Sequence, residues 1–282
     1  MEQKIVITAD STCDLSHELI DKYGIKIVPL YVTADGKSYR DGVDIEPSFI
    51  FDYVSRTGEL TKTAAVSVSD YEAIFKQYTN EGYTVIHINI SAEFSACHQN
   101  ANIVASEMEN VYTVDSRNLS TGSGLVVLAA AEMVQAGKSA KDIVKELNEL
   151  TSKVEASFVV DKLTYLKMGG RCSSVAALGA NLLNLKPCIE VKDGKMGVGK
   201  KYRGNLSKSI VDYVNDRLKG RTDIDSKRIF ITHTPCDDEI VAKVKSAVAE
   251  NYSFDEVIET TAGCTISNHC GPGTLGILFV RK

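Results

Sequence analysis

The sequence predicts an α/β protein of two domains, in which parallel or mixed sheets are covered by helices. Short β-branched runs alternate with helical patterns along the whole chain, and this alternation is typical of such sheets. The length of 282 residues exceeds one ordinary core and suits two domains. We expect an N-terminal α/β domain with a mainly parallel sheet at 1–152, and a C-terminal α/β domain with a mixed sheet at 153–282.

The expected strands of the first domain are short apolar runs. They are Lys4–Thr8, Ile25–Val32, Thr84–Ile90 and Val111–Val114. Helical patterns follow three of these runs, at Leu15–Tyr23, Phe94–Glu109 and Gly122–Ala136, and a Ser139-capped amphipathic helix follows at Ala140–Leu150. Asp14, Ser69 or Asp70, and Ser120 are interpreted as helix caps.

The second domain shows the same alternation. Its expected strands are Ser157–Val160, Cys188–Val191, Arg228–Ile231, Glu256–Thr260 and Leu275–Val280. Asp193-Gly194 predicts a β-hairpin turn, and Asp237 or Asp238 begins a helix that runs to Asn251.

Composition excludes several classes of function. A formal net charge of -5 argues against a nucleic-acid surface. The most apolar stretch, Leu125–Ala131, is far shorter than the roughly 20 residues of a membrane helix, and the acid-bearing N-terminus does not fit a signal peptide. We therefore expect at most transient membrane contact. Seven cysteines without framework spacing favour free thiols in a reducing cytoplasm.

Small hydroxyl residues stand where the predicted parallel strands end. Ligands of such sheets bind beyond the carboxyl ends of the strands, where helix N-termini present free N–H groups. Ser91 and Ser95 follow the third strand, and a turn before one helix needs only one cap. This turn is a candidate anion site. A separate hydroxyl cluster, with Thr63 and Ser67, precedes the helix expected near Asp70.

Two further segments are candidate site elements. The turn Gly271-Pro272-Gly273 directly after His269 and Cys270 would fix the direction of the imidazole, although these residues alone favour an ordinary turn with a satisfied histidine. Arg171 follows Gly169-Gly170 and could clamp an anion, dock a partner, or be a solvated charge. Cys172–Leu185 has no charged residue, which predicts a buried helix or a cavity wall.

These segments together resemble the DegV family, the fatty-acid-binding subunits of bacterial fatty acid kinase. The resemblance spans nearly the whole chain and is carried by the order of several short motifs. They are Thr8–Leu15 (TADSTCDL), Val28–Leu30 (VPL), Thr63–Ser67 (TAAVS), Ser91–Gln99 (SAEFSACHQ), Leu166–Arg171 (LKMGGR), Leu183–Pro187 (LNLKP), Asp193–Lys195 (DGK) and His269–Gly273 (HCGPG).

The resemblance implies a two-domain carrier, not an enzyme, with one long-chain fatty acid buried between the domains and no cofactor. It implies that Thr63, the Ser91/Ala92 pair with Ser95 nearby, and His269 hold the carboxylate. It also implies that a partner kinase phosphorylates the presented carboxylate, docking at Arg171 and Arg203. The chain has no GxxxxGK[ST] loop, so the partner would bind ATP.

The chain departs from the family pattern near the head group. Ala92 replaces a serine, and Ala64-Ala65-Val66 replaces the middle of the usual TSQPS segment. Ser91, Ser95 or water would then substitute for the lost hydroxyl. We expect neutral hydroxyl donors, without a metal or a fixed cation, to satisfy the carboxylate.

Three other interpretations remain open from the residues alone. The first is a hydrolase or acyltransferase that uses Cys97 or Cys270 with His98 or His269, although the chain has no GxSxG elbow. The second is a regulatory protein that binds no lipid. The third is a zinc site, whose candidate ligands are His233, Cys236, Cys264, His269 and Cys270.

Overall fold

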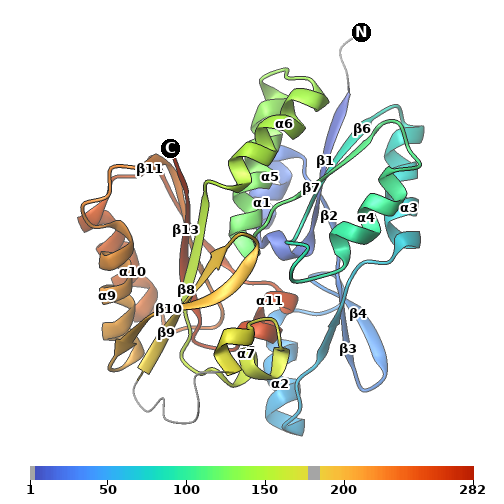
Figure 1. Cartoon of the computed structure of the whole chain (residues 1–282). Helices are drawn as coiled ribbons and strands as arrows, with labels where there is room; N and C mark the ends of the chain where they lie inside the picture. Colours follow the sequence, from blue (N-terminus) through green and yellow to red (C-terminus); the bar gives the residue numbers. More distant parts are fainter. Residues whose placement is uncertain (1–3, 177–184) are drawn as a thin grey trace.

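The computed structural model describes residues 4–176 and 185–282 and arranges them as three sheets with helices around them (Figure 1). The strands are β1 Ile5–Asp10, β2 Lys26–Val28, β3 Tyr31–Ala34, β4 Lys37–Arg40, β5 Lys62–Ala64, β6 Thr84–Asn89, β7 Val111–Asp115, β8 Val154–Val159, β9 Leu185–Lys192, β10 Lys195–Arg203, β11 Ile224–His233, β12 Glu256–Thr261 and β13 Leu275–Arg281. The helices are η1 Ser11–Cys13, α1 His17–Tyr23, α2 Pro47–Thr57, α3 Val68–Asn80, α4 Cys97–Ala105, α5 Ser120–Gln135, α6 Ala140–Thr151, α7 Thr164–Gly169, α8 Ser173–Ala176, α9 Leu206–Leu218, α10 Asp238–Asn251 and α11 Cys264–Cys270.

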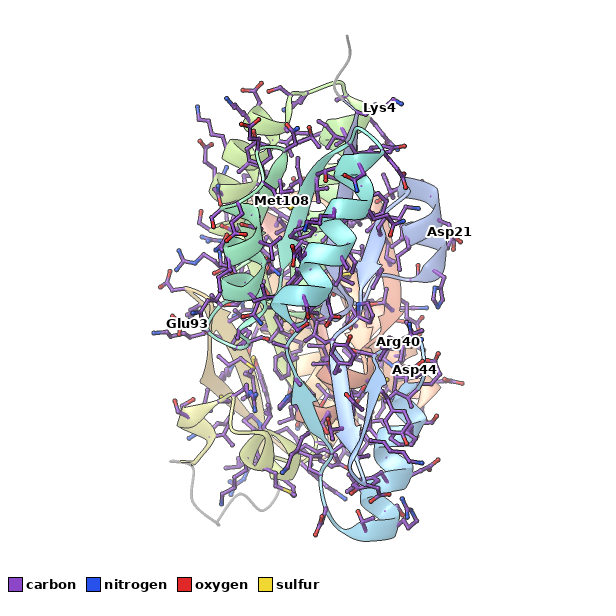
Figure 2. The ribbon with its side chains drawn as sticks, turned by 90° about the vertical axis from the view of Figure 1, so that its right-hand side faces the viewer. Lys4, Asp21, Arg40, Asp44, Glu93 and Met108 are labelled. Carbon is purple, nitrogen blue, oxygen red and sulfur yellow. The ribbon has the colours of Figure 1, made fainter. Side chains whose placement is uncertain are left out.

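The first sheet is parallel throughout, in the order β2-β1-β6-β7. The chain leaves β1 toward β2 on one side, and β6 lies on the other side of β1. A crevice therefore forms at the carboxyl ends of β1 and β6, the point where ligands bind in open α/β sheets. Helices α3 and α4 pack on this sheet, on the face seen in Figure 2, and α5 packs on β1 and β6.

The second sheet is mixed, in the order β10-β9-β8-β13-β11-β12, and only its β11–β12 pair is parallel. Helices α9 and α10 pack against each other, and their buried side chains share one core cluster with β11 and β13. Helix α5 also contacts β8, β11 and β13, so it lies between the two large sheets. The residues Gly124–Leu128 are all buried and all apolar. This fits the central position, because a helix buried on every side is apolar on every face.

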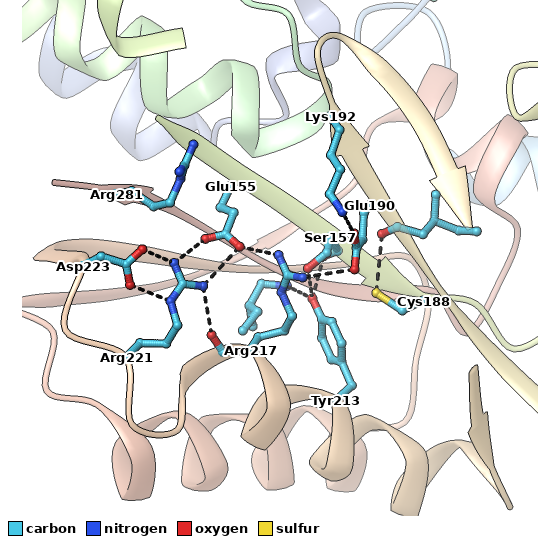
Figure 3. A network of polar contacts seen from close by, with 12 residues as sticks. Glu155, Ser157, Cys188, Glu190, Lys192, Tyr213, Arg217, Arg221, Asp223 and Arg281 are labelled. Carbon is cyan, nitrogen blue, oxygen red and sulfur yellow. Dashed lines mark hydrogen bonds and ion pairs between the residues drawn. The ribbon is translucent and has the colours of Figure 1, made fainter. Parts of the chain in front are cut away.

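A charged network fixes α9 to the second sheet (Figure 3). Arg217 binds Glu155 of β8 at 2.5 Å and Glu190 of β9 at 3.1 Å. Arg221 binds both Glu155, at 2.8 Å, and Asp223, at 2.7 Å. Shared carboxylates and low exposure make this network worth more than isolated surface pairs. We assign the network a structural role, because each of these charged side chains pairs with an oppositely charged neighbour.

The predicted α/β architecture with parallel and mixed sheets is confirmed, and most expected elements appear within a few residues of their predicted bounds. The expected strand Ile25–Val32 is wrong as one element. Pro29, which lacks an N–H, separates β2 of the parallel sheet from β3 of a small antiparallel sheet of order β4-β3-β5. Strands up to β7 belong to the first and third sheets and later strands to the second, while the division at residue 152 stays a prediction.

The caps also differ in part from expectation. Ser16, not Asp14, caps α1, and its side chain accepts from the N–H of Leu19. Ser67 caps α3 in a capping box with Asp70. The hairpin at Asp193-Gly194 and the cap at Ser139 are confirmed. Of the described helices, none is long and apolar enough to cross a bilayer.

Candidate functional site

A largely apolar cavity lies where the carboxyl ends of the parallel strands meet the C-terminal half of the chain. About 520 Å³ of space lies between its lining atoms with the open mouth included, and the centre of a water molecule can occupy about 50 Å³ of it. Its apolar wall comes from both halves: Leu30, Ile90, Phe94 and Leu119 from the first, and Met196, Ile266 and Cys270 from the second. The polar residues of the lining are Thr63, Ser95, Arg171, Thr265 and His269.

Strand β5 and helix α11 meet at one end of this cavity. The hydroxyl Oγ1 of Thr63 lies 2.9 Å from Nε2 of His269. Two residues earlier, just before β5, Thr61 donates to Oδ1 of Asn268 at 2.5 Å. Alternate residues of a strand point to the same side, so Thr61 and Thr63 both face the end of α11. The two hydrogen bonds join segments 206 and 207 residues apart in the sequence.

His269 is neutral at physiological pH. Burial, and then the guanidinium of Arg171, lower the pKa of its imidazole to about 4. The residue is still partly accessible, but Nδ1 is shielded and has no hydrogen-bond partner in the described structure. Gly169 packs on this nitrogen, since a Cβ there would come within 2.3 Å of Nδ1. The glycine is therefore required by the position of the ring.

The two tautomers of His269 differ in cost. With the proton on Nδ1, a buried N–H donor would have no acceptor, and such orphaned donors are rare in folded proteins. With the proton on Nε2, the imidazole donates to Oγ1 of Thr63 and only an acceptor is left unpaired. The second tautomer is therefore favoured. It leaves the hydroxyl hydrogen of Thr63 free to donate to a ligand.

The serines after β6 have separate roles. Ser95 lines the cavity, and its hydroxyl donates to Sγ of Cys97 at 3.1 Å. Ser91 is buried outside the lining and donates to the carbonyl of Gly194 at 2.8 Å, in the hairpin of the other half. The side chain of Ala92 is exposed. Ser91 holds the β9–β10 hairpin, and of the predicted set only Thr63, Ser95 and His269 line the cavity. The expected carboxylate contact at Ser91/Ala92 stays a prediction.

Arg171 lies at the mouth of the cavity, where its guanidinium donates to the carbonyl of Gly169 at 2.9 Å. It also lines an adjoining surface groove together with Lys62, Thr63 and His269. Its charge is close enough to lower the pKa of His269, and that neutral donors alone satisfy the carboxylate stays a prediction. Arg203 is exposed at the end of β10.

The Gly-Pro-Gly turn ends α11 and supports it. Gly271 has φ +75°, and a Cβ there would lie 2.5 Å from the ring of Tyr165. Gly273 has φ +72°, and its N–H donates to the carbonyl of Pro235 at 3.0 Å. Both positions favour glycine because their φ angles are positive, and at Gly271 the ring of Tyr165 also leaves no room for a side chain. Pro272 between them completes the connection to β13.

The geometry gives little support to the thiol-dependent hydrolase or acyltransferase and to the zinc site. Burial raises the pKa of Cys97 and of Cys270 to about 12, so both thiols stay protonated and poorly nucleophilic at neutral pH. His233, proposed for zinc, contacts Glu259 and the carbonyl of Thr234 instead. Within residues 4–176 and 185–282, no three His, Cys, Asp or Glu residues are grouped as metal ligands. Most of the charge-free segment Cys172–Leu185 lies outside the described residues.

Sequence reasoning missed three contributors to the site. Thr265 lines the cavity and its buried hydroxyl has no partner among the described residues. Gly169 makes room for the imidazole, and Asp41 binds the first turn of α11 from the other half of the chain. The GGR motif drew attention to Gly169. For Thr265 and Asp41 the sequence holds no local signal.

Known proteins share this architecture over their full length. The model of the DegV family, described as "Uncharacterised protein, DegV family", matches residues 4–282. A DegV domain-containing protein of Caldanaerobacter subterraneus is 32% identical over 284 residues, covering 99% of this chain and 100% of that protein. The structure of a DegV family protein from Thermus thermophilus, described for its fatty acid binding, is 30% identical with a TM-score of 0.90, covering 99% and 100%. A stearic acid-binding protein from Eubacterium ventriosum is 28% identical with a TM-score of 0.84, covering 99% and 98%.

Proposed function

Since this chain belongs to the DegV family, we propose that it binds one long-chain fatty acid, non-covalently, in the cavity between its two halves. The main observation behind the proposal is that the Thr63–His269 pair lies at one end of an apolar cavity. Similar proteins from Thermus thermophilus and Eubacterium ventriosum, described as fatty-acid-binding, support it.

The two parts of the cavity suit the two parts of a fatty acid. Each methylene removed from water gains ~0.8 kcal/mol, so a tail of about fifteen gains about 12 kcal/mol before the costs of association. A carboxylate buried without partners would cancel much of this gain. The Thr63 hydroxyl, oriented by the imidazole of His269, donates to one oxygen. Ser95 and the nearby Arg171 provide a second hydroxyl and a positive potential.

In the finer form of the proposal, the protein presents this carboxylate to a partner kinase. The kinase transfers the γ-phosphoryl group of its ATP to a carboxylate oxygen, which gives an acyl phosphate and ADP, while the carrier makes no bond itself. Support comes from the groove that adjoins the Thr63–His269 pair and contains Lys62 and Arg171, since cations there would favour an incoming phosphoryl group. Arg171 and the exposed Arg203 are the proposed docking residues, and we place this exchange in the cytoplasm.

Native mass spectrometry and lipid extraction of the purified protein test the binding. We expect one added mass per chain, matching a long-chain fatty acid in the extract. Preparations from several expression hosts that all lack bound mass, and that take up no added fatty acid after delipidation, would contradict the proposal. The kinase step has its own test, because charge reversal at Arg203, which does not line the cavity, should abolish acyl-phosphate formation but leave fatty-acid binding.

A further inference from the structure

The short helix α11 carries two polar residues of the cavity, Thr265 and His269. They are four residues apart and therefore lie on one face of the helix. The N-cap position is occupied by Gly263, which has no side chain to accept the free N–H groups of the first turn. The acceptors come instead from the other half of the chain, more than 220 residues away.

Asp41 provides two of these acceptors. Its Oδ1 lies 2.8 Å from the backbone nitrogen of Cys264, and its Oδ2 lies 3.1 Å from that of Thr265. The hydroxyl of Ser11 donates to Oδ2 at 3.1 Å, and Asp41 is only 2% exposed. One buried carboxyl group, fixed by its own neighbour, thus binds two successive N–H groups.

Asp14 provides the third acceptor. Its Oδ1 lies 2.9 Å from the nitrogen of Gly263, and Ser120 donates to its Oδ2 at 2.5 Å. Burial raises the pKa of Asp14 to about 8, against the hydrogen bonds from Ser120 and Gly263, and nearby Asp41 adds to the rise. The oxygen Oδ1 accepts the Gly263 N–H in either protonation state. Both carboxyl groups therefore surround the start of α11.

The opposite end of α11 is held by hydrogen bonds with Thr61 and Thr63. Between these attachments the seven-residue helix rises only about 10 Å. A helix this short has little stability of its own, so its position depends on what holds its ends. A shift of the first turn would be passed on to Thr265 and His269.

We infer that Asp41, assisted by Asp14, is a positioning residue of the fatty-acid site, which holds the first turn of α11 and thereby fixes the imidazole that orients Thr63. The inference rests on the proposed function. It goes beyond a stabilising role, because it assigns to Asp41 an effect on recognition of the carboxylate end of the ligand. The tail-binding wall, which comes largely from other elements, is not involved.

The test compares Asp41→Asn with Asp44→Asn. Both remove one acidic side chain, but Asp44 is exposed and pairs with Arg40 on the surface (Figure 2). The measured quantity is the ratio of the affinities for a C18 fatty acid and for the C18 alcohol, in delipidated full-length protein. We expect Asp41→Asn, whose amide N–H₂ opposes the helix N–H groups, to reduce this ratio about tenfold and to shift the NMR signals of the His269 ring. Asp44→Asn should change neither.

Ser11→Ala is a milder second variant, for the case that Asp41→Asn does not fold. It removes the hydroxyl that fixes Asp41 and that also accepts from the N–H of Leu30, and we expect a smaller change in the same direction. An acid-to-alcohol ratio and His269 signals equal to wild type in the folded variants would overturn the inference while fatty-acid binding stands. A wild-type protein that binds neither ligand would overturn the proposed function as well.

Discussion

Replacement of Thr63 by valine tests the proposed carboxylate contact at a single atom. Valine keeps the shape of threonine and removes the hydroxyl that lies 2.9 Å from His269 Nε2. A hydrogen bond to a charged group contributes about 1.5–3 kcal/mol. At about 1.4 kcal/mol for each factor of ten, we expect the fatty-acid Kd to rise by about 10- to 150-fold.

The loss should depend on the charge of the ligand. A fatty alcohol of equal length gains only about 0.5–1.5 kcal/mol from a neutral hydrogen bond, so its Kd should rise less. Titration calorimetry on delipidated protein measures both ligands. Thr33→Val is the matched control, because Thr33 lies on the neighbouring strand β3 and does not line the cavity. Equal Kd values for the acid in wild type and Thr63→Val would refute the assigned contact.

Three further predictions follow from the packing and charge around the site. Gly169→Ala should displace the imidazole of His269, since its Cβ would lie 2.3 Å from Nδ1, and should weaken fatty-acid binding in calorimetry despite the better helix propensity of alanine. Gly197→Ala, with no atom within 4 Å of its Cβ, is the control, and equal effects of the two would speak against the steric argument. Ser91→Ala should lower the free energy of unfolding by about 1–3 kcal/mol in urea titrations, because the buried Gly194 carbonyl loses its donor. The fatty-acid Kd should stay within about twofold of the wild-type value. A large loss of affinity would instead assign Ser91 to the binding site. His269 has a folded-state pKa of about 4, below its unfolded value, so the unfolded chain binds more protons between pH 6.5 and 4. The contribution of His269 to the free energy of unfolding is present above pH 6.5 and is lost as the pH falls to 4, by up to about 3 kcal/mol. His269→Gln should remove this part of the pH dependence of unfolding. An unchanged slope of the free energy of unfolding against pH would contradict the lowered pKa.

The sequence predicts those parts of the fold that have a strong local pattern. The β-branched runs of β1, β6 and β7 are buried strands of one parallel sheet, and Ser139 caps α6 as expected. The small sheet was missed because β4, Lys37–Arg40, is polar and largely exposed and offers no alternation of apolar residues. Pro29 lies within an apolar run, and only the tertiary structure shows that the run divides there between two sheets.

The candidate site was predictable only in part. The shared role of Thr63 and His269 came from the resemblance to a family, since nothing in their local patterns links residues 206 positions apart. The choice between Ser91 and Ser95 depends on the turn between β6 and α4, which directs one hydroxyl to the hairpin and the other to the cavity. Asp41 lies in a surface-like sequence, and its contact with α11 spans 223 residues.

The central claim is that the carboxylate of a bound fatty acid is held at the Thr63–His269 pair. The most direct measurement is ¹³C NMR of a long-chain fatty acid labelled at the carboxyl carbon and bound to the delipidated protein. We expect one carboxyl signal, distinct from that of free acid, that shifts in Thr63→Val but not in Thr33→Val. A carboxyl signal at the position of the free acid, or one that is the same in both variants, would contradict the claim.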